Sequence, residues 1–547
     1  MERVKTENKL LYQFNELAQS HPDDLAVRFY NSSTNIQEVT YGWLYREAAR
    51  VSNTLTNKYR LPSGEGVGIF LETSLSAISS IYGIWLAHGV IVSLPLPTRK
   101  NDLDYYLFRL RTIINQTNLR FIIAGNVSER MLSKLDVKVT VIQSDQMVKK
   151  NKILVNNNYI NNSDEVSLIQ YTSGSTSSPK GVRLSHNAVA NNVESIKECL
   201  DLNNKSKALG WLPLSHDMGL IGTVLLPVYS KCEVTLFPPM RFILNPKIWV
   251  QLLSKYKITV TIGPNFAYNL CARKFPEELL STIDLRSLQH CLVGSEPVKS
   301  KTLEDFIHKF KKAGLRAESL KPCYGLAENV VAVSIFKQEC AFIEEPHPGS
   351  NGNGNRNQFV SMGKPLQGIL VAIMDNSGKL LSDNQLGEIA IKGHSLMSGY
   401  VGKNPEYTFT KDGWYLTGDL GWKINGQLYI AGRKSDVIIR SGVNYYAHDI
   451  ENELNDLEGL RQGGIVCFGV TDDEIGTERI IIWVEIHLSR KAGKYELENE
   501  INNRVFKRFG FKPDRIEIFH KRVIPKTSSG KIRRFHCKDI YLKNQRT

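Results

Sequence analysis

A run of hydroxylated residues near residue 175 has the composition of an anion-binding loop. The segment YTSGSTSSPKGVRLSH, residues 171–186, places six Ser or Thr side chains around Gly174 and then adds Lys180. It follows a short apolar run that predicts a strand and precedes an amphipathic helical pattern. A small polar loop in that position can direct N–H groups and hydroxyls at a phosphate. Lys180 precedes Gly181, which is the wrong order for a Walker A motif. Taken alone, the segment fits either a phosphate loop or a solvated Ser/Gly turn.

Five further motifs with chemically useful residues follow this loop. They are GSEPV from Gly294, YGLAE from Tyr324, TGDLG from Thr417, GRKSDVIIRSGVNYYAHDIE from Gly432 and PKTSSGKIRR from Pro525. Each motif alone is weak evidence for any protein family, whereas the loop followed by the five motifs in this order is a highly specific pattern. With them the chain resembles the adenylate-forming superfamily of acyl-CoA ligases, peptide-synthetase adenylation domains and luciferases, over nearly its whole length.

The resemblance implies a site for ATP and Mg²⁺. The β- and γ-phosphates would meet the hydroxyls, N–H groups and ammonium of Thr172, Ser173, Gly174, Ser175, Thr176 and Lys180. The adenine pocket would contain Gly294, Ser295, Glu296, Pro297, Tyr324, Gly325, Leu326 and Ala327. Tyr324 would present its flat face to the base, and Asp419 would bind both ribose hydroxyls beside Arg433. Glu328 and Thr176 would be ligands of Mg²⁺, a hard cation that prefers oxygen.

The resemblance also implies the reaction and a moving part. A substrate carboxylate attacks the α-phosphorus of ATP and pyrophosphate leaves, so negative charge accumulates where Lys531 would place its ammonium. Lys531 belongs to a C-terminal domain that is mobile in the superfamily, and closure of that domain would deliver it. We expect an AMP-binding domain over residues 1–434 and the mobile domain over residues 435–547. Ser435 stands at the hinge position, where relatives usually carry Asp or Lys.

Two segments indicate the fatty acyl-AMP ligase branch of the superfamily. WLPLSHDMGLIG, residues 211–222, and GPNFAYNLCARK, residues 263–274, are similar to that branch, with departures at Ser215 and Asn269. We expect the substrate to meet His216, Asp217, Met218, Phe266 and Ala267. His216 is also a catalytic candidate at the mouth of an acyl tunnel, and a satisfied core histidine is the alternative. Core packing is an equal alternative for the last three residues.

The branch forms an acyl-adenylate from a fatty acid and MgATP, and then passes the acyl group to the phosphopantetheine thiol of an acyl carrier protein. A long- or medium-chain fatty acyl-CoA ligase is the nearest alternative. Amino-acid-activating domains hold the substrate amine with an acidic residue; PNFAYNL, residues 264–270, contains none, and Asp217 is the only nearby candidate. A non-catalytic nucleotide sensor is disfavoured because Lys531, Glu328 and Asp419 are all present. Residues 336–360 are the candidate for an extra segment that restrains the C-terminal domain in this branch.

The positive charge of the chain is concentrated at its C-terminal end. The net charge is +14, and residues 501–547 hold 14 Lys or Arg against three acidic residues, a difference of +11. Nucleic acid is a disfavoured partner because this segment lacks zinc-finger spacing, basic-zipper heptads and aromatic RNA-binding signatures. An acidic carrier protein is the expected partner, with Arg533, Arg534 and Lys538 at the contact. A merely solvated basic face is the alternative.

Other features of the sequence bear on the compartment. The first residues, MERVKTENKLLYQFNE, are charged and lack the apolar core of a secretory signal. The most apolar region is interrupted by Glu72 and His88, so it predicts a strand–helix–strand unit rather than a membrane span. Eight scattered cysteines without a CxxC pair suit a reducing compartment and no structural zinc site. We expect a cytoplasmic protein with no transmembrane segment.

The elements that must position these motifs follow an α/β pattern. Apolar runs of β type alternate with helical patterns from about residue 60 to 330, which predicts α/β layers with largely parallel sheets. Alternating runs at residues 368–375 and 387–393 predict a small β-rich unit, and the Gly/Asn-rich residues 347–358 predict a loop. We therefore expect a large N-terminal domain of layered α/β sheets with a small β-rich unit, and a smaller α+β C-terminal domain.

Overall fold

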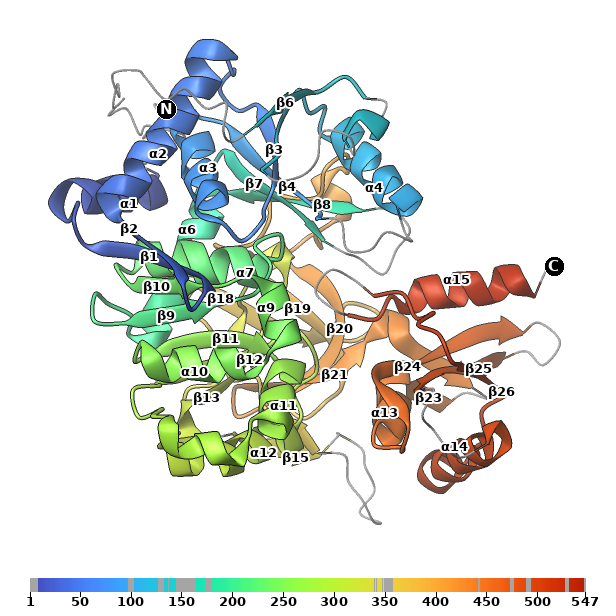
Figure 1. Ribbon diagram of the computed structural model, residues 1–547. Coiled ribbons are helices and arrows are strands. Elements are labelled where there is room, and N and C mark those ends of the chain that lie inside the picture. The colour runs from blue at the N-terminus through green and yellow to red at the C-terminus, as the bar shows by residue number, and fades with distance from the viewer. Residues whose placement is uncertain are drawn as a thin grey trace.

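The described part of the chain forms a large body and a smaller C-terminal part beside it (Figure 1). The computed structural model describes residues 8–96, 103–125, 132–135, 137–143, 164–172, 179–338, 340, 342–346, 348, 358–440, 443–472, 477–487, 493–526 and 531–545. The large body runs from blue to orange in Figure 1, and the smaller part, orange to red, carries the C-terminus.

A six-stranded sheet holds the hydroxylated loop at its edge. Its strands, in the order β6-β5-β3-β4-β7-β8, are Thr140–Ile142, Phe121–Ile123, Gly66–Phe70, Val90–Leu94, Val166–Thr172 and Lys180–Ser185. Neighbouring strands are parallel except β7 and β8, which pair antiparallel with Thr172 opposite Lys180. The loop therefore joins two strands, and the expectation of a loop directly before a helix is wrong because β8 intervenes. The predicted helix follows as α6, His186–Leu200.

A nine-stranded sheet forms the centre of the large body. Its strands, in the order β17-β14-β13-β12-β11-β9-β10-β1-β2, are Lys364–Pro365, Ser334–Ile335, Leu320–Tyr324, His290–Gly294, Val260–Pro264, Lys207–Gly210, Glu233–Leu236, Leu25–Ser32 and Asn35–Thr40. The strands from β13 to β1 pair in parallel. Parallel strands place their carboxyl ends at one edge, and ligands of open α/β sheets bind beyond that edge.

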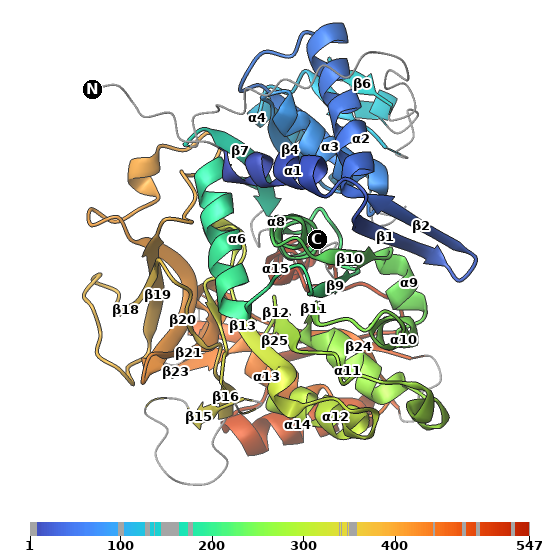
Figure 2. The same ribbon diagram turned by 90° about the vertical axis from the view of Figure 1, so that its left-hand side faces the viewer.

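Helices cover both of these sheets. They are α1 (Lys9–Ser20), α2 (Tyr41–Asn53), α3 (Leu75–Leu86), α4 (Leu103–Gln116), α7 (Asp217–Leu220), α8 (Leu226–Tyr229), α9 (Pro239–Leu244), α10 (Lys247–Lys255), α11 (Asn265–Lys274) and α12 (Ser300–Phe310). Figure 2 shows α6 standing between the central sheet and the strands β18–β20. Its Asn192 donates to the carbonyl of Ala332 and its Ser195 to that of Gln367, so α6 ties these layers together.

The remaining strands form smaller antiparallel units. β18 (Ile369–Met374), β19 (Gly387–Gly393), β20 (Tyr415–Ile424) and β21 (Gln427–Arg433) make a four-stranded meander, and β15 (Glu344–Pro346) pairs with β16 (Gln358–Val360). After them come β22 (Val437–Arg440) with β23 (Val443–Tyr446), and the sheet of β24 (Leu460–Asp472), β25 (Thr477–Ile486) and β26 (Arg515–Phe519). The helices of this C-terminal part are α13 (Ala447–Leu454), α14 (Lys494–Phe509) and α15 (Arg534–Asn544).

The hydrophobic cores follow the same division. One core extends over the central sheet, part of the six-stranded sheet and the meander, from Leu10 to Leu428. Two further cores, around Ile480 and around Trp483, contain only residues that follow Asp436. The layered α/β class and the small β-rich unit are as predicted.

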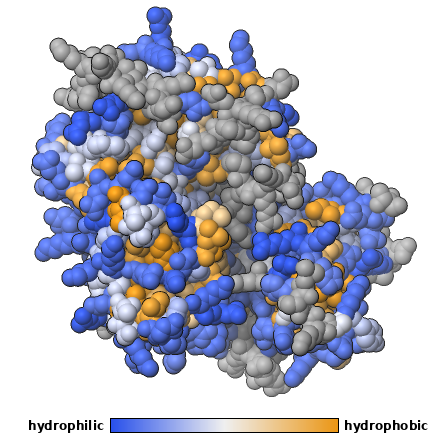
Figure 3. Space-filling view, in the orientation of Figure 1, coloured by the Kyte–Doolittle hydropathy of each residue, from blue (hydrophilic) through white to orange (hydrophobic). Residues whose placement is uncertain are grey.

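No helix within the described ranges is long and apolar enough to cross a bilayer. On the face seen in Figure 3 the apolar surface is divided into separate patches among hydrophilic residues.

A half-buried ion cluster fixes α15 to the C-terminal part. Arg534 donates to Asp436 and, at 2.8 and 2.9 Å, to both carboxylate oxygens of Glu451, and its Nε donates to the carbonyl of Cys467 at 2.8 Å. The side chains of Arg534 and Glu451 are only 16% and 12% exposed. These charges raise the pKa of Arg534 despite the opposing effect of burial.

Arg534→Ala is expected to destabilise the C-terminal part by about 3 kcal/mol, because it leaves two carboxylates without their cation. The measurement is the urea unfolding midpoint followed by the fluorescence of the full-length protein. Lys543→Ala on the same helix is the matched control, since the Lys543–Asp539 pair is exposed. Equal midpoints for the two variants would contradict this account.

Candidate active site

Four of the predicted motifs meet at the carboxyl edge of the central sheet. WLPLSHD follows β9, PNFAY follows β11, GSEP follows β12 and YGLAE begins at the end of β13. The register places Pro264 opposite Gly294 and Val293 opposite Pro322, so these strands end at nearly the same level. The sheet therefore brings together residues that are up to 117 positions apart, from Trp211 to Glu328.

Asp419 is the most deeply buried charged group of this region, at 6% exposure. It lies on β20 opposite Arg433 of β21, and the Arg433 Nε is 2.7 Å from its Oδ1. The hydroxyl of Tyr324 donates to its Oδ2 at 2.6 Å. Burial raises the pKa of Asp419, and the Arg433 charge and the Tyr324 hydrogen bond oppose that shift. The link between Tyr324 and Asp419, which sequence analysis did not identify, joins YGLAE to TGDLG.

Glu296 of the GSEP motif contacts the PNFAY motif. Its Oε1 accepts a hydrogen bond from the N–H of Phe266 at 2.5 Å, at the N-terminus of α11. A carboxylate is favoured there because the first N–H groups of a helix lack intrahelical partners. Burial raises the pKa of Glu296. The preceding Ser295 has φ +68°, a left-handed conformation that turns the chain sharply after β12.

His216 and Asp217 lie at the start of α7. The His216 Nδ1 is 2.5 Å from Asp217 Oδ1, and the same carboxylate oxygen accepts from the N–H of Met218 at 2.6 Å. Burial alone would raise the pKa of Asp217, but the His216 ring, and then Lys531, lower it below its ordinary value. The His216 side chain keeps 23% of its surface exposed, and its Nδ1 also accepts from the N–H of Met218 at 3.3 Å.

Lys531 enters this region from the C-terminal part. Its side chain has solvent contact, yet enough protein surrounds the ammonium for burial to lower its pKa. The negative charge of Asp217 opposes the pKa shift, Arg433 adds to it, and Glu296 and Asp419 oppose it. Lys531 therefore stands within electrostatic reach of groups from three separate motifs of the large body.

Glu328 lies in the short 3₁₀ turn Ala327–Asn329 that follows β13. Its Oε1 accepts a hydrogen bond from the Tyr400 hydroxyl at 2.7 Å, and no hydrogen bond to its Oε2 is found among the residues described above. Within those ranges no three His, Cys, Asp or Glu side chains cluster as a metal site. A single carboxylate with a free oxygen fits Mg²⁺, which proteins commonly hold by one or two carboxylates together with substrate phosphates.

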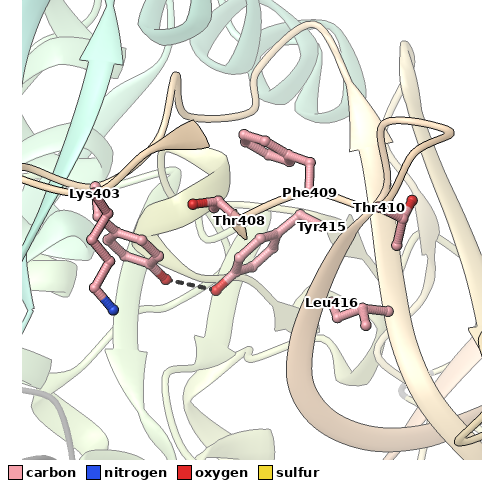
Figure 4. Close-up of a pocket in the computed structure, with 7 residues that line it drawn as sticks. Lys403, Thr408, Phe409, Thr410, Tyr415 and Leu416 are labelled. Atoms are coloured by element: carbon pink, nitrogen blue, oxygen red, sulfur yellow. Dashed lines mark hydrogen bonds between the residues drawn. The ribbon is translucent and has the colours of Figure 1, made fainter. Parts of the chain in front are cut away.

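Lys180 lies near the ring of Tyr400, whose hydroxyl bonds to Glu328. Its Nζ is 5.7 Å from the centre of the Tyr400 ring. A hollow of about 350 Å³ adjoins this group, and Figure 4 shows its lining. The lining residues are Tyr400, Lys403, Thr408, Phe409, Thr410, Tyr415 and Leu416. Tyr400 and Tyr415 lie between the predicted motifs and were not found by sequence analysis.

The expected phosphate loop is only partly described. Ser173, Gly174, Ser175 and Thr176 lie outside the described residues, and of Thr172 only the pairing with Lys180 in the strands is known. Gln170, just before the loop, donates from its side-chain amide to the carbonyl of Ser215 at 2.9 Å. This bond joins the loop strand to the WLPLSHD motif and was also missed.

The predicted substrate residues differ in their surroundings. Met218 and Ala267 are buried in the main core, at 6% and 0% exposure. Phe266 is half-buried and makes an edge contact with Trp211, with 6.4 Å between ring centres. An apolar cavity nearby, bounded by residues that include Gly222 and Ile262, holds only about 10 Å³. An acyl chain would therefore have to displace side chains here.

The adenine-pocket candidates surround the end of β12 and β13. Leu326 and Ala327 are buried, at 7% and 4% exposure, and Pro297 is exposed. Gly294 and Gly325 allow close backbone approach, since a Cβ would lie 2.7 Å from the Cys323 carbonyl oxygen at the first position and 1.7 Å from that of Val331 at the second. The two glycines keep these strand ends and turns in contact.

Comparison with known proteins agrees with this geometry. The family model described as AMP-binding enzyme matches residues 14–401. Putative ligase Rv1013 of Mycobacterium tuberculosis is 30% identical over 496 residues, which cover 86% of this chain and 89% of the relative. The medium-chain-fatty-acid–[acyl-carrier-protein] ligase JamA of Moorena producens is 34% identical over 408 residues, which cover 70% and 68%. A solved structure from a study of fatty acyl-adenylate ligases of E. coli and L. pneumophila superposes with a TM-score of 0.90 at 27% identity, over 99% of both chains.

The fold and the cleft define an adenylate-forming enzyme, an ATP-dependent ligase that makes acyl-adenylates. The match over residues 14–401 covers well over half of the 547 residues. This chain belongs to the AMP-binding enzyme family.

Gly325→Ala is expected to lower the thermal midpoint and to impair ATP binding, because its Cβ would collide with the backbone of Val331 and Ala332, just after the Glu328 turn. Overpacking of this kind costs about 1–3 kcal/mol. Gly222→Ala is the control, since its Cβ would be in ordinary contact, 3.5 Å from Ile262. Calorimetric melting and ATP titration of both variants provide the measurement. The account fails if Gly325→Ala melts and binds ATP as the wild type does.

Proposed function

We propose that this enzyme is a fatty acyl-AMP ligase. It activates a fatty acid with MgATP to an acyl-adenylate and pyrophosphate, and then transfers the acyl group to the phosphopantetheine thiol of an acyl carrier protein. The observation that carries the proposal is that Lys531, from the C-terminal part, lies within electrostatic reach of Asp217, Glu296, Asp419 and Arg433 of the large body.

The chemistry of the first step explains the arrangement. A carboxylate oxygen of the acid forms a bond to the α-phosphorus of ATP, and the bond from that phosphorus to the pyrophosphate oxygen breaks. Both reactants are anions, so a cation held between them lowers the barrier by electrostatics and positioning. Lys531 is that cation in our proposal, and His216, beside the expected position of the carboxylate, orients the acid.

The nucleotide is assigned to the groups around this cation. Asp419 accepts hydrogen bonds from the ribose hydroxyls, since each carboxylate oxygen can accept more than the one bond that it already has. Lys180 and the hydroxylated loop bind the β- and γ-phosphates, and Tyr324 faces adenine. Mg²⁺, when bound through Glu328, neutralises charge on the phosphates.

The fatty acid is inferred from the relatives and from the pocket. JamA and the solved acyl-adenylate ligase are named for fatty-acid substrates. In this chain the segment of residues 263–274 contains no acidic residue that could hold a substrate amine. Phe266 is half-buried and packs against Trp211 and Phe242, which are buried in the main core, so the surroundings of this segment are apolar.

The second step needs the C-terminal part to move, and we place its hinge at Ser435, between domains of residues 1–434 and 435–547. The residue before Ser435 is bound to the large body, and the residue after it is bound to the C-terminal part. Lys434 pairs with Glu388 of β19 at 2.8 Å, whereas Asp436 pairs with Arg534 of α15. Rotation of one domain against the other is thereby concentrated in the backbone of Ser435. The small side chain of this residue makes no ion pair.

The carrier protein is assigned to the basic surface of the C-terminal domain. Lys507, Lys512, Lys521 and Arg522 are exposed there and can attract an acidic partner. The expectation that Arg534 belongs to this contact is wrong, because its guanidinium points inward to Asp436 and Glu451.

Lys531→Ala is expected to reduce pyrophosphate release by about 100- to 1000-fold, with little change in ATP affinity, because the ammonium acts mainly on charge that develops during the reaction. The assay follows pyrophosphate from ATP with and without a C8–C16 fatty acid. Lys543→Ala, which removes an exposed lysine of the same C-terminal part, is the matched control. Pyrophosphate release that depended on neither the acid nor Lys531 would overturn the proposed function.

The acceptor thiol separates the two candidate ligases. With ATP and fatty acid, the enzyme is expected to acylate a phosphopantetheinylated carrier protein and to leave acyl-AMP unreacted when CoA is supplied instead. Mass spectrometry of carrier protein and CoA measures both products. Efficient formation of acyl-CoA would show that the enzyme is a fatty acyl-CoA ligase with the same first step.

A further inference from the structure

A short segment of the large body connects the phosphate-loop strand with the Glu328 turn. The N–H of Met397 donates to the Glu328 carbonyl at 2.8 Å. The next residues, 398–401, pair with β8 through three backbone hydrogen bonds of 2.8–3.0 Å to Gly181 and Arg183. Tyr400 lies within this segment, opposite Val182. Its backbone is therefore fixed to both of the elements that we assign to the phosphates.

The side chain of Tyr400 connects the same two elements. Its hydroxyl bonds to Glu328 Oε1 at 2.7 Å, and its ring lies 5.7 Å from the Nζ of Lys180. A cation near the face of an aromatic ring is attracted to it, and an ionised acceptor strengthens a hydrogen bond. Tyr400 thus contacts an anionic and a cationic group at once.

A second tyrosine determines the direction of this hydrogen bond. The Tyr400 and Tyr415 hydroxyls are 2.8 Å apart, as the dashed line in Figure 4 shows. A carboxylate only accepts, so the single proton of Tyr400 goes to Glu328, and Tyr415 must donate to Tyr400. A tyrosine hydroxyl ordinarily keeps its proton at neutral pH, so each of the two hydroxyls has one hydrogen to donate.

The turn that carries Glu328 requires such support. Val330, two residues further on, has φ +65°, a conformation that is unfavourable for a β-branched residue. Unfavourable backbone conformations of this kind persist only where surrounding contacts impose them. The hydrogen bond from Tyr400 to Oε1 restricts rotation of the carboxylate, and Oε2 has no hydrogen-bond partner in the part of the chain that the structure describes.

We propose that Tyr400, held in turn by Tyr415, is a positioning residue that orients the Glu328 carboxylate for Mg²⁺ and keeps it at a fixed distance from Lys180. The inference rests on the proposed role of Glu328. Tyr400 itself touches neither metal nor substrate in this account, and it acts by removing the rotational freedom that Glu328 would lose on binding the cation.

Tyr400→Phe tests the proposal, because it removes the hydroxyl and keeps the ring beside Lys180. We expect ATP affinity in EDTA to be unchanged, and the Mg²⁺ concentration that gives half-maximal enhancement of ATP binding to rise about 10-fold, as for loss of a hydrogen bond to a charged group. Tyr415→Phe is expected to have a smaller effect of the same sign. Isothermal titration calorimetry of the full-length protein with ATP at a series of Mg²⁺ concentrations measures both quantities.

Tyr41→Phe is the matched control. It also removes a buried tyrosine hydroxyl, which donates to the Cys232 carbonyl at 3.2 Å far from the cleft. If Tyr400 had a merely structural role, Tyr400→Phe would lower the thermal midpoint as Tyr41→Phe does and would leave the Mg²⁺ dependence of ATP binding unchanged. That result would overturn the proposal.

Glu328→Gln separates this inference from the proposed function. If Glu328→Gln weakens the Mg²⁺ dependence and Tyr400→Phe does not, only the role of Tyr400 falls. If Glu328→Gln leaves the Mg²⁺ dependence of ATP binding unchanged, the proposed role of Glu328 as a metal ligand is wrong. In the double variant the two effects are expected not to add, since both act on one carboxylate.

Discussion

The parallel register of β9, β11, β12 and β13 is the constraint on which the site depends. β11, β12 and β13 end at nearly the same level and β9 ends two residues earlier, so each motif that follows a strand begins near its neighbours. Glu296 then reaches the first turn of α11, and Tyr324 reaches Asp419 on the separate meander. A shift of one strand by a single residue would turn these side chains to the other face of the sheet. The packing of the large body and the geometry of the cleft therefore have the same origin.

Much of the fold and site could be predicted from the sequence because each motif contains residues whose chemistry is local. A hydroxyl-rich loop, a Tyr-Gly turn and an Asp between glycines have the same binding chemistry wherever the sheet places them. The alternation of apolar runs with helical patterns gave the α/β class for the same reason. The order of these motifs then identified the superfamily, and the comparisons confirm it.

The features that could not be predicted depend on contacts between distant segments. Tyr400 and Tyr415 lie outside the motifs, and only the pairing of residues 398–401 with β8 brings them to Glu328. Arg534 belongs to a basic run that resembles exposed surface, yet two carboxylates draw it inward. The strand β8 was missed because its residues, KGVRLS, carry mixed polar and apolar side chains without a long β-type run. Sequence spacing contains no information about such pairs.

The environment of Lys531 has a consequence for the order of events. Without a nucleotide, burial disfavours the charged ammonium of Lys531, and the positive charge of Arg433 repels it. The negative charges of Asp217, Glu296 and Asp419 oppose these two effects without cancelling them. In the reaction that we propose, a bound triphosphate supplies further negative charge, so nucleotide binding and insertion of Lys531 would favour each other by the same free energy. Departure of pyrophosphate would remove most of that charge. The inserted position of Lys531 would then be less favourable after the first step than before it, and loss of the leaving group would favour opening.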